Sequence, residues 1–263
     1  MSSQRTVSDW KVWLLVWALG IAGIVAVMPY VIELQGLALR QAAAKASMSV
    51  PTILALSAVQ GAVLLGICSR IGIWAARRVC LSFPILDAIA ARKSIPWSGS
   101  AALAASLSGL VGGAFVVLID VFVFAPSKAV ALNDNQPAAW KGFLASFYGG
   151  VTEEIFLRLF LLSLLALGLR RLTLGADSRG RAVPSAAFWT ANILAALAFG
   201  LGHLPATAVL APLTPLLVVR AIVLNGVLAL LFGALYRRYG LEMAILAHFS
   251  ADIALHVVPP LVG

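Results

Sequence analysis

Long apolar stretches follow one another along the whole chain, separated by short segments that carry charges, proline or glycine. Seven stretches are long enough to cross a hydrocarbon layer of about 30 Å. They lie at residues 12–33, 46–69, 95–119, 142–169, 184–204, 213–236 and 241–261. No connection between them has room for a soluble domain. The pattern predicts an all-α, polytopic transmembrane helical bundle with about seven spanning helices.

The segment at residues 70–93 breaks this pattern. It is apolar in places, but Arg77, Arg78 and Asp87 lie within it and Pro84 stands in its middle. Such a mixture is typical of an amphipathic segment at the membrane surface. We therefore predict an interfacial segment, with an eighth spanning or re-entrant element as the alternative.

Composition supports the bilayer as the main partner of the chain. Hydrophobic residues make up 62% of it, charged residues only 11%, and the mean hydropathy is +1.00. The net charge of +9 does not indicate nucleic acid, because the basic residues sit between apolar segments and are not interleaved with aromatic stacking positions. We expect no nucleic-acid partner.

Lys and Arg are distributed unevenly between the two sides of a seven-helix bundle. The side of the N-terminus receives 13, and the other side receives five. The 13 are Arg5, Lys11, Arg70, Arg77, Arg78, Arg92, Lys93, Arg170, Arg171, Arg179, Arg181, Arg237 and Arg238; the five are Arg40, Lys45, Lys128, Lys141 and Arg220. This asymmetry favours a cytoplasmic N-terminus.

The fourth apolar stretch contains three ionisable residues: Glu153, Glu154 and Arg158. Each costs roughly 2.5 to 3.5 kcal/mol at the centre of a bilayer. Glu154 and Arg158 are spaced i, i+4 and in the order that suits an ion pair on a helix. Glu153 points about 100° away from Glu154, so it is free for another task. A carboxylate without a local partner inside a membrane suits a general base or a metal ligand.

The three histidines of the chain all lie in its last third. His203 shares a helix face with Phe199 near the end of the fifth stretch. His248, Asp252 and His256 form one polar stripe at i, i+4 and i+8 in the last stretch. A carboxylate one turn from a histidine can orient its ring. His256 lies near Pro259 at the chain end, where we expect it to be interfacial and inert.

A glutamate and histidines around a water are the equipment for hydrolysis, with or without a metal. The candidate site residues are Glu153, His203, His248 and Asp252, and the same four are the candidate ligands if Zn²⁺ or another divalent metal is bound. The sequence lacks HExxH, GxSxG and GxGD, which mark other intramembrane protease types.

Three motifs resemble those of the CPBP family of intramembrane (CaaX-type) proteases, which is also Abi-related and includes bacteriocin-immunity proteins. EExxxR corresponds to Glu153, Glu154 and Arg158, FxxxH to Phe199 and His203, and HxxxD to His248 and Asp252. The resemblance covers roughly residues 142–259. We therefore divide a single integral membrane domain, 1–263, into N-terminal helices with the basic interfacial segment at 1–141 and a motif-bearing catalytic core at 142–263.

The resemblance implies an endopeptidase that acts on a membrane-associated peptide or protein in the bacterial cytoplasmic membrane. It implies that Glu153 and His203 activate the water, that His248 and Asp252 bind the scissile carbonyl or its oxyanion, and that Glu154, Arg158 and Phe199 support them. The eukaryotic prenyl endopeptidases usually carry Asn where this chain has Asp252, and a carboxylate donates no hydrogen bond unless it is protonated. We favour a role for Asp252 in orienting His248, with metal binding as the alternative.

Two other functions fit the same residues. A non-catalytic immunity or scaffold protein of this family would carry the same motifs. A transporter would use intramembrane charges as an ion path, but the chain shows no convincing internal repeat, so we favour it less.

Overall fold

The computed structural model describes residues 8–125, 137–175 and 181–262, and every regular element in these ranges is helical. The predicted all-α fold is confirmed. Arg5, Lys128 and Arg179, which contributed to the count of basic residues on each side, lie outside the described residues.

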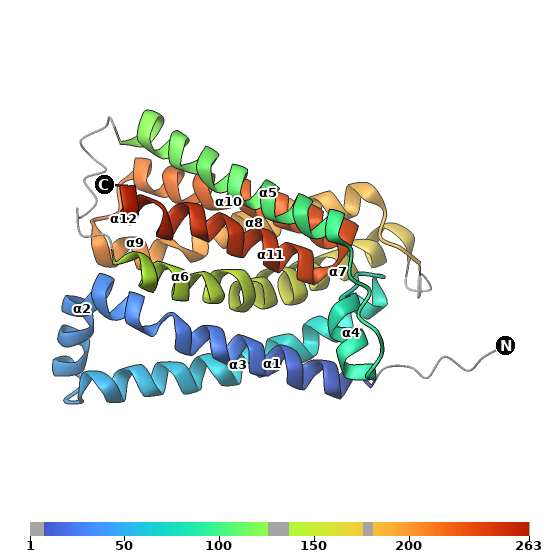
Figure 1. Cartoon of the computed structure of the whole chain (residues 1–263), viewed down its shortest axis with the longest axis horizontal. Helices are drawn as coiled ribbons and strands as arrows, with labels where there is room; N and C mark the ends of the chain where they lie inside the picture. Colours follow the sequence, from blue (N-terminus) through green and yellow to red (C-terminus); the bar gives the residue numbers. More distant parts are fainter. Residues whose placement is uncertain (1–7, 126–136, 176–180, 263) are drawn as a thin grey trace.

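Six helical segments in the described part of the chain are long and apolar enough to cross a membrane. They run alongside one another in a bundle (Figure 1). They are α1 (Asp9–Ala26), α3 (Val50–Arg78), α5 (Gly99–Ile119) with η1 (Asp120–Phe124), α8 (Ser185–Gly202) with α9 (Leu204–Leu210), α10 (Pro215–Tyr239), and α11 (Leu241–Asp252) with η5 (Ile253–Val257) and α12 (Pro259–Val262).

The remaining predicted span, residues 142–169, falls in an almost continuous helical segment of a different kind. α6 (Ala139–Phe147) leads into π-helical η3 (Tyr148–Glu153) and η4 (Ile155–Leu162), and α7 (Ser163–Leu174) follows. A π turn widens the helix and is frequent at functional sites. The motif residues Glu153, Glu154 and Arg158 lie in this widened part. The predicted number of about seven spanning segments therefore agrees with the structure.

The N-terminal part differs from the prediction in two places. The first predicted helix is divided at Val27, where Pro29 in the first turn of α2 (Met28–Lys45) helps a new helix to start. The second difference concerns residues 70–93, because α3 continues to Arg78 and α4 (Pro84–Ala91) has only eight residues. Eight residues span about 12 Å, so no eighth spanning element forms there.

Ser98 caps the start of α5, because its hydroxyl accepts a hydrogen bond from the amide of Ala101 at 3.3 Å. Thr214 caps α10 in the same way through the amide of Leu217, at 3.2 Å. Gly240, at φ +100°, separates α10 from α11. These stops and starts determine where α5, α10 and the motif-bearing helix α11 begin.

Two glycines bring α5 directly against α11 (Figure 1). A Cβ at Gly109 would overlap the carbonyl oxygen of Ala247, and one at Gly113 would overlap Ala251. Small residues at i, i+4 let two helix backbones approach closely in a membrane. This close packing fixes the backbone of α11 on both sides of His248.

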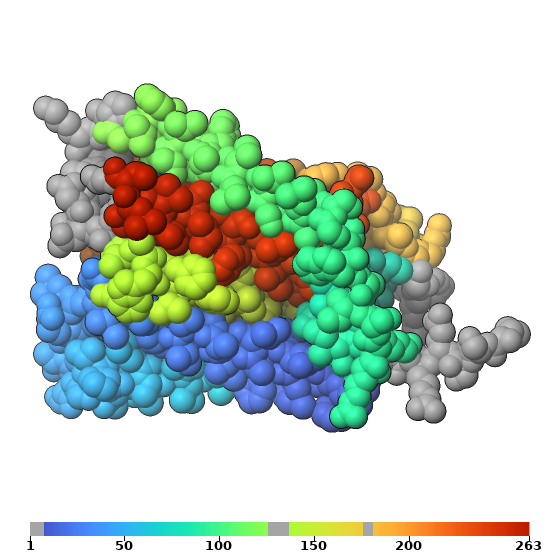
Figure 2. All heavy atoms as spheres, in the orientation of Figure 1, coloured from blue at the N-terminus to red at the C-terminus, as the bar shows by residue number. Residues whose placement is uncertain are grey.

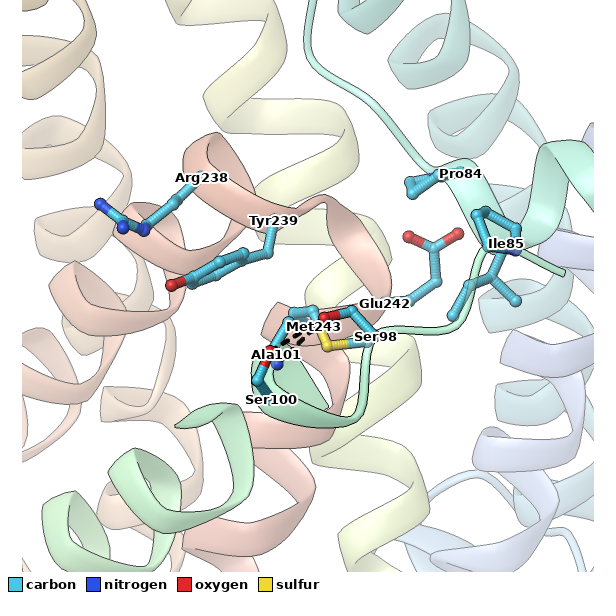
Figure 3. A pocket seen from close by; sticks show the side chains of 10 residues that line it. Pro84, Ile85, Ser98, Ser100, Ala101, Arg238, Tyr239, Glu242 and Met243 are labelled. Carbon is cyan, nitrogen blue, oxygen red and sulfur yellow. Dashed lines mark hydrogen bonds between the residues drawn. The ribbon is translucent and has the colours of Figure 1, made fainter. Parts of the chain in front are cut away.

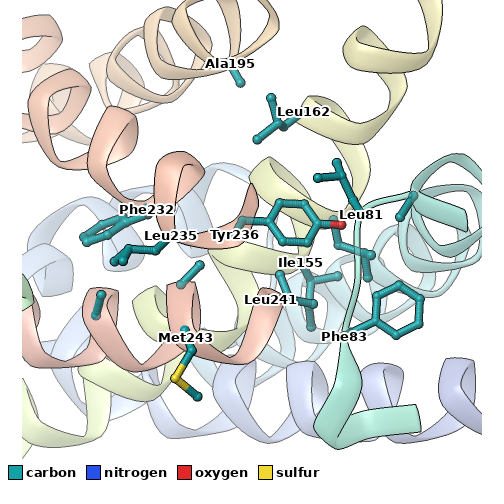
Figure 4. Close-up of a cluster of buried hydrophobic side chains, with 14 of the residues drawn as sticks. Leu81, Phe83, Ile155, Leu162, Ala195, Phe232, Leu235, Tyr236, Leu241 and Met243 are labelled. Atoms are coloured by element: carbon teal, nitrogen blue, oxygen red, sulfur yellow. The ribbon is translucent and has the colours of Figure 1, made fainter. Parts of the chain in front are cut away.

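The interior is apolar and so is much of the surface. Phe232, Tyr236 and Leu241 belong to the buried cluster drawn in Figure 4. α5 runs across the face shown in Figure 2. Its side chains Leu103, Val111 and Phe115 are exposed. An apolar outer face around a packed interior is what a helical bundle in lipid requires.

Basic residues gather at one end of the bundle. Arg78, Arg171 and Arg238 lie in the last turns of α3, α7 and α10. These ends meet near α4, because Leu241 donates its amide to Ser82 at 3.0 Å and Arg170 donates to the carbonyl of Arg78. The basic end agrees with the uneven distribution seen in the sequence, and the cytoplasmic orientation of that end stays a prediction.

Candidate active site

A buried ion pair lies at the centre of the motif-bearing helices. Nη1 of Arg158 is 2.9 Å from Oε1 of Glu154, and the two side chains are 2% and 0% exposed. Nη2 of Arg158 also donates to the carbonyl oxygen of Ala229 on α10, at 3.1 Å. The pair expected from the spacing of these residues is confirmed, and it ties η4 to α10.

Glu154 also holds His248, which lies on α11. Nδ1 of His248 is 2.7 Å from Oε1 of Glu154. Because a carboxylate paired with Arg158 only accepts hydrogen bonds, Nδ1 carries the proton and donates it. Nε2 of His248 is then the nitrogen that faces the remaining carboxylates.

Asp252 does not hold His248 in the way that we favoured from the sequence. Its Oδ1 lies 3.7 Å from Nε2 of His248, which is longer than a hydrogen bond. Glu154, 94 positions away in the chain, makes the hydrogen bond to the ring instead. Asp252 is itself buried, with 6% of its surface exposed, and Gly149 of η3 packs directly against its carboxylate.

Glu153 approaches the same nitrogen of His248 and is partly exposed. Its Oε2 is 3.7 Å from Nε2 of His248, and 21% of its side chain is exposed. Glu154, the next residue, is fully buried. The two adjacent glutamates therefore occupy different environments, because one is closed by an ion pair and the other is partly exposed.

His203 is connected to His248 through the ring of Phe199, which contacts both histidine rings. Its Nδ1 lies 2.8 Å from the carbonyl oxygen of Phe199, and since a carbonyl only accepts, Nε2 is the acceptor nitrogen of the neutral ring. The Phe199 ring stands edge-on to His203, with centroids 4.6 Å apart, and edge-on to His248, at 5.8 Å. His203 ends α8 and caps the short helix α9.

A separate pocket of about 350 Å³ opens near α4 (Figure 3). Ser98, Tyr239 and Glu242 are among its lining residues. Oε1 of Glu242 accepts a hydrogen bond from the amide of Leu86 at 2.8 Å and so attaches α4 to α11. None of the motif residues lines this pocket, so we do not assign the candidate chemistry to it.

The comparison with protein families bears on the segment that carries all three motifs. Residues 135–254 match the model of the type II CAAX prenyl endopeptidase Rce1-like family. This segment is similar to the Rce1-like family. The match confirms the resemblance seen in the motifs and ends two residues after Asp252. The chain matches no curated protein and no solved structure.

The described donors of this segment are not arranged as a metal site. In the described ranges, no group of three or more His, Cys, Asp or Glu side chains is placed to hold a metal ion. Nδ1 of His248 is already engaged by Glu154, and Nε2 lies 3.7 Å from both Glu153 and Asp252. The Zn²⁺ or other divalent metal expected from the residue types stays a prediction.

His256, the last member of the predicted polar stripe, has a different partner. Its Nδ1 is 3.3 Å from the hydroxyl of Tyr30 on α2, and the two rings meet edge-on. It therefore links α2 to η5, at the end of α11.

Two residues near His248 were not predicted from the sequence. Phe232 of α10 stacks on the His248 ring, with centroids 4.5 Å apart and planes 19° from parallel. Gly149 leaves the space that the Asp252 carboxylate fills. An apolar residue in an apolar helix gives no signal of its own, and the only hint for Gly149 was its place four residues before Glu153.

Proposed function

We propose that this protein is an intramembrane endopeptidase that hydrolyses a peptide bond of a membrane-associated substrate with a water activated by Glu153 and His203. Similarity of residues 135–254 to the Rce1-like family supports protease activity of the CAAX-protease type. The observation that carries the proposal is the unequal state of the two glutamates: Glu154 is paired with Arg158 and His248, whereas Glu153 is partly exposed beside the same histidine.

Glu153 accepts a proton from the water in this proposal, and the resulting hydroxide attacks the scissile carbonyl carbon. Nε2 of His203 is an acceptor that can hold the same water, because Nδ1 is turned to the Phe199 carbonyl. The protonated Glu153 then returns the proton to the leaving amine. Every proton taken from the water is thereby accounted for.

His248 provides the charge that the tetrahedral intermediate needs. With Nδ1 donating to Glu154, a protonated ring directs its second N–H, at Nε2, towards the carbonyl oxygen. Asp252 lies 3.7 Å from that nitrogen and favours the cationic ring by its charge. Asp252 thus supports the oxyanion donor without donating to the oxyanion itself.

Hydrolysis can be tested without knowing the natural substrate. Purified protein in proteoliposomes is incubated with a library of membrane-spanning peptides in water enriched in ¹⁸O, and the products are measured by mass spectrometry. We expect one ¹⁸O atom in each new C-terminal carboxylate. If the wild-type protein cleaved no peptide of the library, the result would favour the non-catalytic immunity or scaffold function instead.

Replacing Asp252 with Asn separates electrostatic support from metal binding. If Asp252 acts through its charge on His248, Asp252→Asn should lower kcat by about tenfold, a modest share of what an oxyanion donor contributes. The metal content per protein, measured by plasma mass spectrometry, should be the same in both proteins. A variant that is inactive and has lost bound metal in parallel would make Asp252 a ligand and the protein a metalloprotease.

A further inference from the structure

Phe232 lies against the one histidine that three carboxylates surround. It belongs to α10, outside the three motifs, and its side chain is completely buried. Its ring lies almost parallel to the His248 ring, at a centroid distance of 4.5 Å. Figure 4 shows Phe232 beside Leu235 and Tyr236 on α10. The stacking is thus built into a rigid helix rather than a loop.

One hydrogen bond does not fix the plane of an imidazole ring. The bond from Nδ1 of His248 to Glu154 holds one corner, and the ring can still turn about that contact. Phe232 covers one face, and Phe199 meets the ring at 89°. The two aromatic rings leave a single plane, in which Nε2 lies 3.7 Å from Glu153 and from Asp252.

Arg158 holds the two aromatic rings in this arrangement. Its guanidinium carbon is 5.2 Å from the ring centroid of Phe232 and 5.2 Å from that of Phe199, within the range of cation–π attraction. It also binds the carbonyl of Ala229, which lies three positions before Phe232 on α10. A displacement of Phe232 would therefore disturb the Arg158 contacts as well.

We propose that Phe232 is a positioning residue that holds the imidazole of His248 in one plane, so that Nε2 points to the place of the scissile carbonyl. The inference deepens the proposed function and rests on it for its effect on catalysis. A small misplacement of a catalytic group lowers the rate without weakening substrate binding. Loss of the ring at position 232 should therefore reduce kcat and leave KM unchanged.

The chain has only three histidines, so nuclear magnetic resonance of protein labelled with ¹⁵N and ¹³C in histidine can observe His248 directly. His203→Gln and His256→Gln variants assign the signals. In the wild type we expect one set of His248 ring signals, with Nδ1 protonated and the ring C–H protons shifted upfield by the stacked phenyl ring. In Phe232→Leu we expect that upfield shift to vanish, the ring signals to broaden or split, and kcat to fall about tenfold.

Phe188→Leu is the matched control, since Phe188 is also buried but lies away from the motif residues. The guanidinium carbon of Arg237 is 4.5 Å from the centroid of its ring. The Phe188→Leu variant should leave the His248 signals and kcat as in the wild type. The Phe232→Tyr variant keeps an aromatic ring and should therefore retain the upfield shift. If Phe232→Leu does not fold, Phe232→Met is used in its place. The inference would be overturned if the His248 signals of Phe232→Leu had the same sharpness and the same chemical shifts as those of Phe188→Leu and the wild type. Because the spectra need no substrate, they decide the positioning role even if hydrolysis itself is not found.

Discussion

Glu153→Gln is expected to abolish hydrolysis while leaving the protein folded. The amide has the shape of the carboxylate but cannot accept the proton of the water, and general-base catalysis contributes about 10²- to 10⁴-fold to a rate. No hydrogen bond to His248 is lost, because the nearest oxygen of Glu153 is 3.7 Å from Nε2. Incorporation of ¹⁸O into peptide products measures the activity, and thermal unfolding in detergent measures the stability.

Glu33→Gln is the control for a general effect of removing a carboxylate. Glu33 pairs with Lys141 in an exposed contact between α2 and α6, remote in sequence from the motifs. The Glu33→Gln variant should hydrolyse the peptides at the wild-type rate. If the Glu153→Gln variant still produced ¹⁸O-labelled peptides at the wild-type rate, Glu153 would have no part in the mechanism, whatever the stability of the variant.

The sequence predicted the bundle because apolar length is a direct physical requirement of a membrane span. It also predicted the pairing of Glu154 with Arg158, because a buried charge needs a partner and the i, i+4 spacing supplied one. The length of α3 was underestimated, since residues 70–93, with Arg77 among their charges, were assigned to an interfacial segment. In the structure Arg77 forms an ion pair with Asp87 of α4 and remains in the helix.

The contacts that organise the candidate site were harder to predict. The π turns of η3 and η4 leave no mark in an apolar sequence, because a slightly wider helix buries the same residue types. His248 and Asp252 were expected to bond each other because they are one turn apart. The hydrogen bond to Glu154 forms instead, and it depends on how α11 packs against η3, which no local pattern contains.

Glu154→Gln should have the opposite profile to Glu153→Gln, with a large loss of stability as well as of activity. Glu154 is completely buried and is 2.9 Å from Arg158 and 2.7 Å from His248. Removing its charge leaves the guanidinium without a counter-ion, and breaking a buried pair in this way costs roughly 3 to 5 kcal/mol. The free energy of unfolding, measured by denaturant titration in mixed micelles, should fall by that amount.

Glu33→Gln serves again as the control, because an exposed pair contributes only about 0 to 1 kcal/mol. A second variant identifies the cause of the loss. Replacing both partners, Glu154→Gln with Arg158→Met, removes the unpaired charge and should recover much of the stability. It should not recover hydrolysis, because Nδ1 of His248 would still lack its carboxylate partner. A Glu154→Gln protein as stable as the wild type would show that the buried pair does not hold these helices together.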